Sequence, residues 1–173
     1  MPLNAASMSL QLLAKFSSAL DLKTAVADLN FARGSALDSG TGVGQADRIW
    51  DDTRTLGASA TEDLDLSGAA LLDPTGAAVV FARVKFLAVF AAAANVNEVL
   101  VGANVVNGWA TLISPNGAAG GVIHVRPGTG FAAWATDATG YVVTAGTGDL
   151  LHIANGGAGT GVTYDIVVIG CSA

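Results

Sequence analysis

The sequence has little charge and almost no cysteine. Charged residues make up 13% of its 173 residues, whereas an average globular chain carries about 25%. So few charged side chains cannot cover the whole surface of a domain, and we expect part of that surface to be buried against other chains. The single cysteine, Cys171, cannot form a disulfide within the chain. A disulfide-stabilised scaffold is therefore excluded.

Long apolar runs are also missing. The longest uninterrupted run covers residues 86–94, well short of the roughly 20 residues that a membrane-spanning helix requires. The first residues do not follow the basic, apolar, small-residue order of a secretory signal. The net charge of −6 argues against nonspecific binding of nucleic acid. We therefore expect a soluble, non-secreted protein whose partners include neither nucleic acid nor a membrane.

Among the features that the sequence does have, the most prominent is the apolar segment 77–94, AAVVFARVKFLAVFAAAA. Its polar residues fall on alternate positions, so Val84 and Phe86 lie on one predicted face, and Arg83 and Lys85 lie on the other. The β-branched and aromatic content favours a strand over a helix. We expect a strand of about twelve residues, roughly 40 Å long, with the face of Val84 and Phe86 against the core.

Short strands are predicted before and after this segment. Residues 48–56, RIWDDTRTL, and 61–66, TEDLDL, are predicted strands, and residues 73–76, DPTG, predict a turn. From residue 98 onward, apolar segments alternate with glycine-containing turns about every 8–12 residues, which is typical of sandwiches and barrels. The fold class is therefore all-β: an antiparallel β-sandwich, jelly-roll-like, with a less regular N-terminal segment.

That N-terminal segment begins with a predicted strand over residues 8–16. Leu10, Leu12, Ala14 and Phe16 share one of its faces.

The following stretch, residues 17–31, is ambiguous. Leu22, Val26 and Leu29 fit a short helix, while two aspartates also fit turns. We expect a loop or one helical turn there.

A short strand over residues 30–37 and a glycine-rich loop over 35–45 complete the segment. We expect residues 1–46 to form a strand or arm that packs on a sandwich body of residues 47–173, within one domain overall.

Catalytic and cofactor signals are weak. His124 and His152 have no cysteine partner and no HxH or HxxxH spacing, which makes a poor metal signature. No GxSxG sequence surrounds a serine. The glycine-rich stretches 40–44 and 156–161 neither follow a buried strand nor open a helix, as a phosphate-binding loop does. We expect half-buried histidines, no enzyme, no cofactor and no metal.

Two further groups of residues have alternative readings. The acidic groups Asp51-Asp52 and Glu62-Asp63-Asp65 lack the spacing of a calcium loop, so we expect them to be solvated. The three tryptophans could form a stacking platform for sugar, or they could seal the core and anchor a subunit contact. If the tryptophans form a stacking platform, the chain is a carbohydrate-binding module, and we keep this as an alternative function. The tryptophans are Trp50, Trp109 and Trp134.

Two stretches resemble small proteins encoded in the head-gene region of tailed bacteriophages. They are GTGVGQADRIWDDTRTLGASATEDLDLSG, followed by FARVK, and the C-terminal DATG…VTAGTGDLLHIANGGAGTGVTYDIVVIG. The resemblance is to the capsid decoration, or cement, class, many of which are β-sandwiches or jelly rolls on the outside of an icosahedral head. It implies a non-enzymatic virion protein, made in the bacterial host cytoplasm, whose partner is the phage major capsid protein. A head-fibre or tail component is the alternative within structural proteins.

The scarcity of charge agrees with such a role, because a cement protein works by burying area at many symmetric copies. We expect self-association as a homotrimer, with a homodimer as the alternative. The predicted interface residues are Arg48, Trp50 and Arg54, on a strand expected to be exposed, together with Leu12 and Phe16 on the arm.

Overall fold

The computed structural model describes residues 3–103, 106–114 and 121–173, and within these ranges it contains strands and no helix. No helix in the described part of the chain is therefore long and apolar enough to cross a membrane. The strands are β1 (Ala5–Ala19), β2 (Thr24–Ser39), β3 (Gln45–Ala46), β4 (Arg48–Leu56), β5 (Thr61–Asp65), β6 (Arg83–Ala91), β7 (Val99–Ala103), β8 (Val122–Val125), β9 (Gly130–Trp134), β10 (Tyr141–Val142), β11 (Leu150–Asn155) and β12 (Val162–Cys171).

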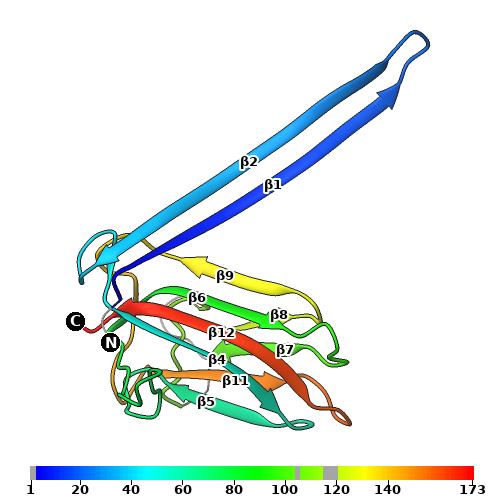
Figure 1. The fold of residues 1–173 in the computed structure, drawn as a ribbon. Coiled ribbons are helices and arrows are strands. Elements are labelled where there is room, and N and C mark those ends of the chain that lie inside the picture. Colours follow the sequence, from blue (N-terminus) through cyan, green and yellow to red (C-terminus); the bar gives the residue numbers. More distant parts are fainter. Residues whose placement is uncertain (1–2, 104–105, 115–120) are drawn as a thin grey trace.

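Two antiparallel sheets form a β-sandwich, which confirms the predicted fold class (Figure 1). One sheet has the order β10-β6-β12-β4, with β9 also paired to β6, and the other has the order β5-β11-β7-β8. The main apolar cluster lies between them and draws buried side chains from both sheets, such as Val168 and Ile166 from β12 and Ile153 and Leu151 from β11. A third sheet, β1-β2-β3, consists mainly of one long hairpin.

The alternation of apolar residues explains the strands of the body. Along β11, Leu151 and Ile153 are buried while the residues between them are partly exposed, as expected for a strand with one face on a core. The predicted strand 48–56 coincides with β4, and the predicted strand 61–66 corresponds to β5. The turn at residues 73–76 also forms, with Gly76 at φ +81°.

The long strand is shorter than expected, and its faces are reversed from Phe86 onward. β6 covers nine residues. Val84 lies in the sandwich core as predicted, but Leu87 and Val89 also contribute to that core while Phe86 faces the opposite side. The reason is a β-bulge: Val84 pairs with Gly170 and Phe86 with Ile169, so Lys85 is an extra residue without a partner on β12. A bulge shifts the alternation by one position.

Lys85 itself is fully buried, contrary to the expectation that it lies on the less dry face. Its Nζ donates a hydrogen bond to the carbonyl oxygen of Asp137. A buried ammonium group requires such a partner. The bulge therefore has a defined side-chain contact as well as a backbone irregularity.

The N-terminal segment is a hairpin that projects from the body (Figure 1). β1 and β2 pair antiparallel without interruption, from Ala5 opposite Asp38 to Ala19 opposite Thr24. The expected helical turn in residues 17–31 is wrong, because this stretch forms the end of β1, the tip and most of β2. The predicted short strand and glycine-rich loop also change, since β2 continues to Ser39.

The hairpin packs on the body only at its base. A second apolar cluster there combines Leu3, Met8 and Leu37 of the N-terminal segment with Ala46 and with Ile169 of β12. Beyond this base, almost every hairpin residue is exposed. The N-terminal segment therefore contacts the body at the base of the hairpin, while the rest of the hairpin extends into solvent.

Candidate interaction surface

One face of the hairpin is apolar along most of its length. Leu12 lies opposite Phe31, and Ala14 lies opposite Leu29. Side chains of paired residues project on the same side of a sheet, and alternate residues of a strand share that side. We call this surface the apolar arm face; it consists of Leu10, Leu12, Ala14, Phe16, Ala27, Leu29 and Phe31.

The large side chains of the apolar arm face are exposed. Leu12 and Leu29 are each 52% exposed, and Phe16 is 73% exposed. Soluble monomers rarely expose a contiguous apolar patch of this kind unless it binds something. A two-stranded hairpin alone is also marginally stable in water. The apolar arm face is therefore a large exposed apolar surface that the rest of the described chain does not cover.

The opposite face of the hairpin is mixed in character. Lys15 lies opposite Asp28, and Leu13 lies opposite Asn30. Leu13 is 65% exposed and Val26, further towards the tip on the same face, is 50% exposed, but Lys15, Asp28 and Asn30 lie between and beside them. The hairpin is therefore amphipathic, and Leu12 and Leu13 are adjacent leucines on its two different faces.

At its base, the apolar arm face meets the outer face of the five-stranded sheet. A pocket of about 430 Å³ lies in this angle, between Met8 and Leu10 of β1 and the aromatic side chains Phe86, Phe90 and Trp134 of the body, among other residues. Phe90 is half exposed. We call this pocket the wedge, and it extends the apolar arm face onto the body.

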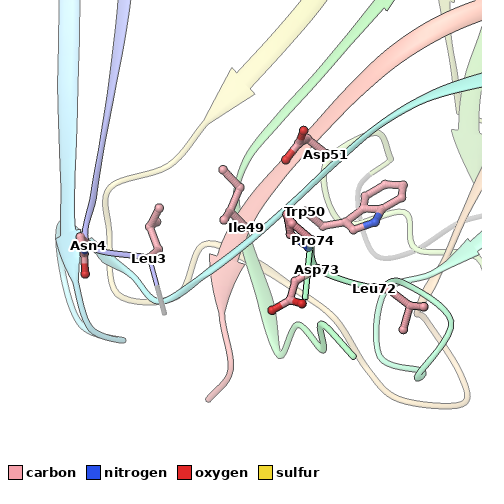
Figure 2. Close-up of a pocket in the computed structure, with 8 residues that line it drawn as sticks. All are labelled: Leu3, Asn4, Ile49, Trp50, Asp51, Leu72, Asp73 and Pro74. Carbon is pink, nitrogen blue, oxygen red and sulfur yellow. The ribbon is translucent and has the colours of Figure 1, made fainter. Parts of the chain in front are cut away.

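A second pocket, of about 480 Å³, lies where residues 3–4, β4 and the turn after Leu72 come together (Figure 2). Two carboxylates line it, Asp51 and Asp73, and Figure 2 shows them apart and pointing in different directions. Oδ1 of Asp73 accepts hydrogen bonds from the backbone N–H of Thr75 at 2.8 Å and of Ala77 at 3.0 Å. This carboxylate thus stabilises its own turn.

The predicted interface residues have different surroundings. Leu12 and Phe16 lie on the apolar arm face. Trp50 does not lie on an exposed surface: it is 5% exposed and belongs to the sandwich core. The prediction for Trp50 is wrong because it points inward from β4. Arg48 lies near the base of the hairpin, and its Nη1 donates to Oδ2 of Asp47 at 3.1 Å.

Arg54 connects the two sheets at the open edge of the sandwich. Its Nε donates to Oε2 of Glu62 on β5 at 2.6 Å, and its Nη1 donates to Oδ2 of Asp52 at 2.9 Å. The hydroxyl of Tyr164, a core residue of β12, donates to Oε1 of the same Glu62 at 2.6 Å. Arg54 is therefore engaged inside its own chain, which favours a structural role over a binding role.

These contacts also change the titration of the two partners of Glu62. The hydrogen bond to Glu62 raises the pKa of Arg54 above its usual range. Burial, and then the hydrogen bond to Glu62, raise the pKa of Tyr164 above its usual range. Arg54 therefore stays charged and Tyr164 stays neutral at physiological pH, and neither is a candidate proton-transfer group.

The two histidines lie on strands of the four-stranded sheet and each contacts a carboxylate. Nδ1 of His152 lies 2.6 Å from Oδ1 of Asp63, and Nδ1 of His124 lies 2.9 Å from Oε1 of Glu98. His152 is half-buried as expected, whereas His124 is exposed. The thiol of Cys171 is buried, and burial raises its pKa, which makes it a poor nucleophile.

The tryptophans do not form a common stacking platform. Trp50 and Trp109 are both core residues, and the indole N–H of Trp109 donates to the carbonyl oxygen of Val142 at 2.9 Å. Trp134 is partly buried beside the base of the hairpin. Trp50 and Trp109 therefore fit the interpretation in which tryptophans seal the core better than they fit a sugar-stacking platform.

The acidic residues do not gather into a metal site in the described part of the chain, which holds no group of three or more potential metal-binding side chains. Asp52 and Glu62 both contact Arg54, and Asp63 contacts His152. The expectation that these residues are simply solvated is therefore too simple, since several form ion pairs.

Sequence reasoning missed half of the apolar arm face. It placed Leu12 and Phe16 on an arm, but it read Leu29 as part of a possible helix. The signal was present in the alternation of Ala27, Leu29 and Phe31, which continues the pattern of β1 on the returning strand. Only the cross-strand register brings the two sets together.

Comparison with protein-family models, with curated proteins and with solved structures finds no match to this chain.

Proposed function

We propose that this chain is a non-enzymatic structural protein of a tailed-phage particle, which binds the outer surface of the icosahedral head and stabilises it. The observation that carries the proposal is the apolar arm face, a surface exposed on a long hairpin whose base is fixed to a rigid sandwich. Such a surface is suited to association with another chain and has no role in covering its own core.

Two further considerations support an assembly role. The hairpin that carries the apolar arm face is anchored to the body by its own small apolar cluster, so the exposed surface is held in a defined position. The resemblance of residues 40–68 and of the C-terminal stretch to phage head-region proteins supplies the biological setting. In this proposal the partners are the phage major capsid protein and further copies of the chain, as a homotrimer or a homodimer.

The mechanism is the addition of many modest contacts. An interface of standard size buries about 1,600 Å². Repetition of such an interface over a symmetric shell ties neighbouring capsid subunits together at every site. A sandwich whose two sheets share one apolar core is a stiff element for this purpose, and its location would be the exterior of the capsid.

The test is the copy number in purified particles from the phage or prophage that encodes the chain. We expect quantitative mass spectrometry to give a near-integral ratio to the major capsid protein, with hundreds of copies per head. We also expect heads that lack the protein to rupture at a lower temperature, and added protein to restore their stability.

Two other results would change the assignment. A handful of copies per particle would indicate a head-fibre or tail component. Absence from particles would contradict the proposal and make the carbohydrate-binding alternative the next one to test, by glycan retention of the wild type and of Trp134→Ala.

A further inference from the structure

The hairpin is a sheet whose apolar arm face has no second layer packed against it within the described chain. An antiparallel sheet with one apolar face buries that face against a second layer, as the two sheets of the body do. The hairpin supplies a single layer that is two strands wide. We infer that its second layer is the same face of a second copy of this chain, so that two hairpins pack face to face about a two-fold axis. The inference rests on the proposed function and names the chain that covers this surface.

The chemistry of the face is self-complementary. Its large side chains are all apolar, and the charged residue nearest to them on the same side is Arg33, opposite Leu10 towards the base. The guanidinium of Arg33 lies over the ring of Phe31, 4.7 Å from its centroid. In an antiparallel two-fold arrangement, the base of one hairpin lies at the tip of the other, so the two Arg33 side chains are at opposite ends. No like charges then face each other across the contact.

The distribution of charge also favours contact through the hairpins. Strands β1 and β2 with their connecting turn contain three basic and three acidic residues, so the hairpin is neutral and the whole net charge of −6 lies on the rest of the chain. Two bodies of this charge repel each other at short range. Packing through the projecting hairpins keeps the bodies apart. The charged residues of the hairpin are Lys15, Asp21, Lys23, Asp28, Arg33 and Asp38.

The hairpin faces supply most of the area of a specific contact. On the same side of the sheet, Met8 and Leu37 already pack on the body, so the free part of β1 runs from Leu10 to Ala19 and is about 34 Å long. Two paired strands are about 10 Å wide, so two such faces together bury about 700 Å², and the rest of the roughly 1,000 Å² of a specific interface must come from the wedge. The wedge, with Phe90 half exposed, can add to this area where the tip of the partner hairpin reaches it.

A lipid surface fits the hairpin less well. Its opposite face carries Gln11, Lys15, Asp28 and Asn30, and its tip carries charged residues as well. Burial of these groups in hydrocarbon would be costly. A second hairpin covers one face and leaves these polar groups in water.

The first experiment measures the mass of the purified full-length chain by sedimentation velocity over a hundredfold range of concentration. We expect a reversible dimer for the wild type. We expect Leu12→Asp, on the apolar arm face, to weaken dimerisation at least tenfold. The matched control is Leu13→Asp, on the opposite face, which should change it less than twofold. Circular dichroism of each variant checks that the sandwich is folded.

The second experiment does not depend on disrupting the contact. Under mild oxidation, Ala14→Cys places a thiol on the apolar arm face near its middle, and Lys15→Cys places one on the opposite face. We expect disulfide-linked dimers for Ala14→Cys and few or none for Lys15→Cys. Equal cross-linking of the two variants would overturn the inference.

Further outcomes separate this inference from the proposed function. A chain that is monomeric at every concentration overturns the inference. If that monomer binds purified heads in a way that depends on Leu12, the occupant is the capsid protein and the proposed function stands. If it floats instead with vesicles of phosphatidylcholine and phosphatidylglycerol, both are wrong. A chain that dimerises through the apolar arm face but never binds heads supports the inference and overturns the proposed function.

Discussion

The hairpin and the sandwich share the same alternating pattern of apolar residues, but they differ in what covers it. In β11, Leu151 and Ile153 are fully buried against the opposite sheet, whereas in β1, Leu10 and Leu12 are each about half exposed. Alternation therefore specifies a strand with an apolar face. It does not specify whether the same chain or another one buries that face.

This difference has an energetic consequence. Full burial of a Leu or Ile side chain stabilises a protein by about 1.5–3 kcal/mol, and the body gains this contribution at many positions. The distal hairpin gains only part of it within the chain, because its large side chains keep much of their exposure. We therefore expect the body to be stable without the hairpin face, and the hairpin to depend on its partner.

The strongest test of this contrast compares two aromatic truncations. Trp109 is fully buried in the core and has an edge-to-face contact with the ring of Tyr141. We expect Trp109→Ala to lower the free energy of unfolding by about 3–5 kcal/mol, because a large cavity forms. We expect Phe16→Ala, on the hairpin, to change the stability of the body by no more than about 0.5 kcal/mol. Urea denaturation of both variants, at a concentration where the chain is monomeric, measures the change in the free energy of unfolding. Similar losses in the two variants would contradict the proposed difference between the hairpin and the body.

A smaller effect is expected at the polar link between the two sheets. In Glu62→Ala, the hydroxyl of Tyr164 and the guanidinium of Arg54 lose a shared acceptor. A buried group left without its partner costs about 1–3 kcal/mol, which denaturant unfolding can resolve. The control is Asp63→Ala, the next residue on β5, whose exposed pair with His152 contributes at most about 1 kcal/mol. If the Asp63 variant lost as much stability as the Glu62 variant, the contacts of Glu62 with Arg54 and Tyr164 would contribute no more than an exposed ion pair.

The smallest effect concerns the turns. The hairpin turn is closed by a backbone hydrogen bond from Leu20 N–H to the carbonyl oxygen of Lys23, while the body turn after Asp137 is held by its side chain. Oδ1 of Asp137 accepts hydrogen bonds from the backbone N–H groups of Gly140 and Thr139, each at 2.8 Å. These bonds, that of Gly140 foremost, lower the pKa of Asp137.

A lowered pKa in the folded state means that the ionised carboxylate contributes stability above pH 4, the unfolded value being about 3.9. This contribution is lost as the pH falls through the folded value. In Asp137→Asn the turn keeps an acceptor but has no titration. We expect the drop in melting temperature between pH 7 and pH 3 to be smaller in the variant than in the wild type. An identical drop in both would show that this carboxylate is not coupled to folding.

Much of the body was predictable because its strands are short and bounded by turn residues. The boundaries of β4 match the prediction, and the DPTG turn forms where proline and glycine require it. The prediction for β6 was wrong in its faces from Phe86 onward, because the bulge at Lys85 depends on the pairing with β12. Trp50 was misplaced for a related reason, since the direction of a side chain on an edge strand depends on where the second sheet lies.

The sequence by itself determined the class of structure. Its alternation and its glycine-containing turns specify strands, because side-chain direction in a strand repeats every two residues and turns need particular backbone angles. Its composition also showed an excess of hydrophobic residues, 51% of the chain, over charged ones, 13%. The tertiary structure alone decided where that excess lies. Leu12 and Phe31 are far apart in sequence, and only cross-strand register places them side by side on a face that the sandwich does not cover.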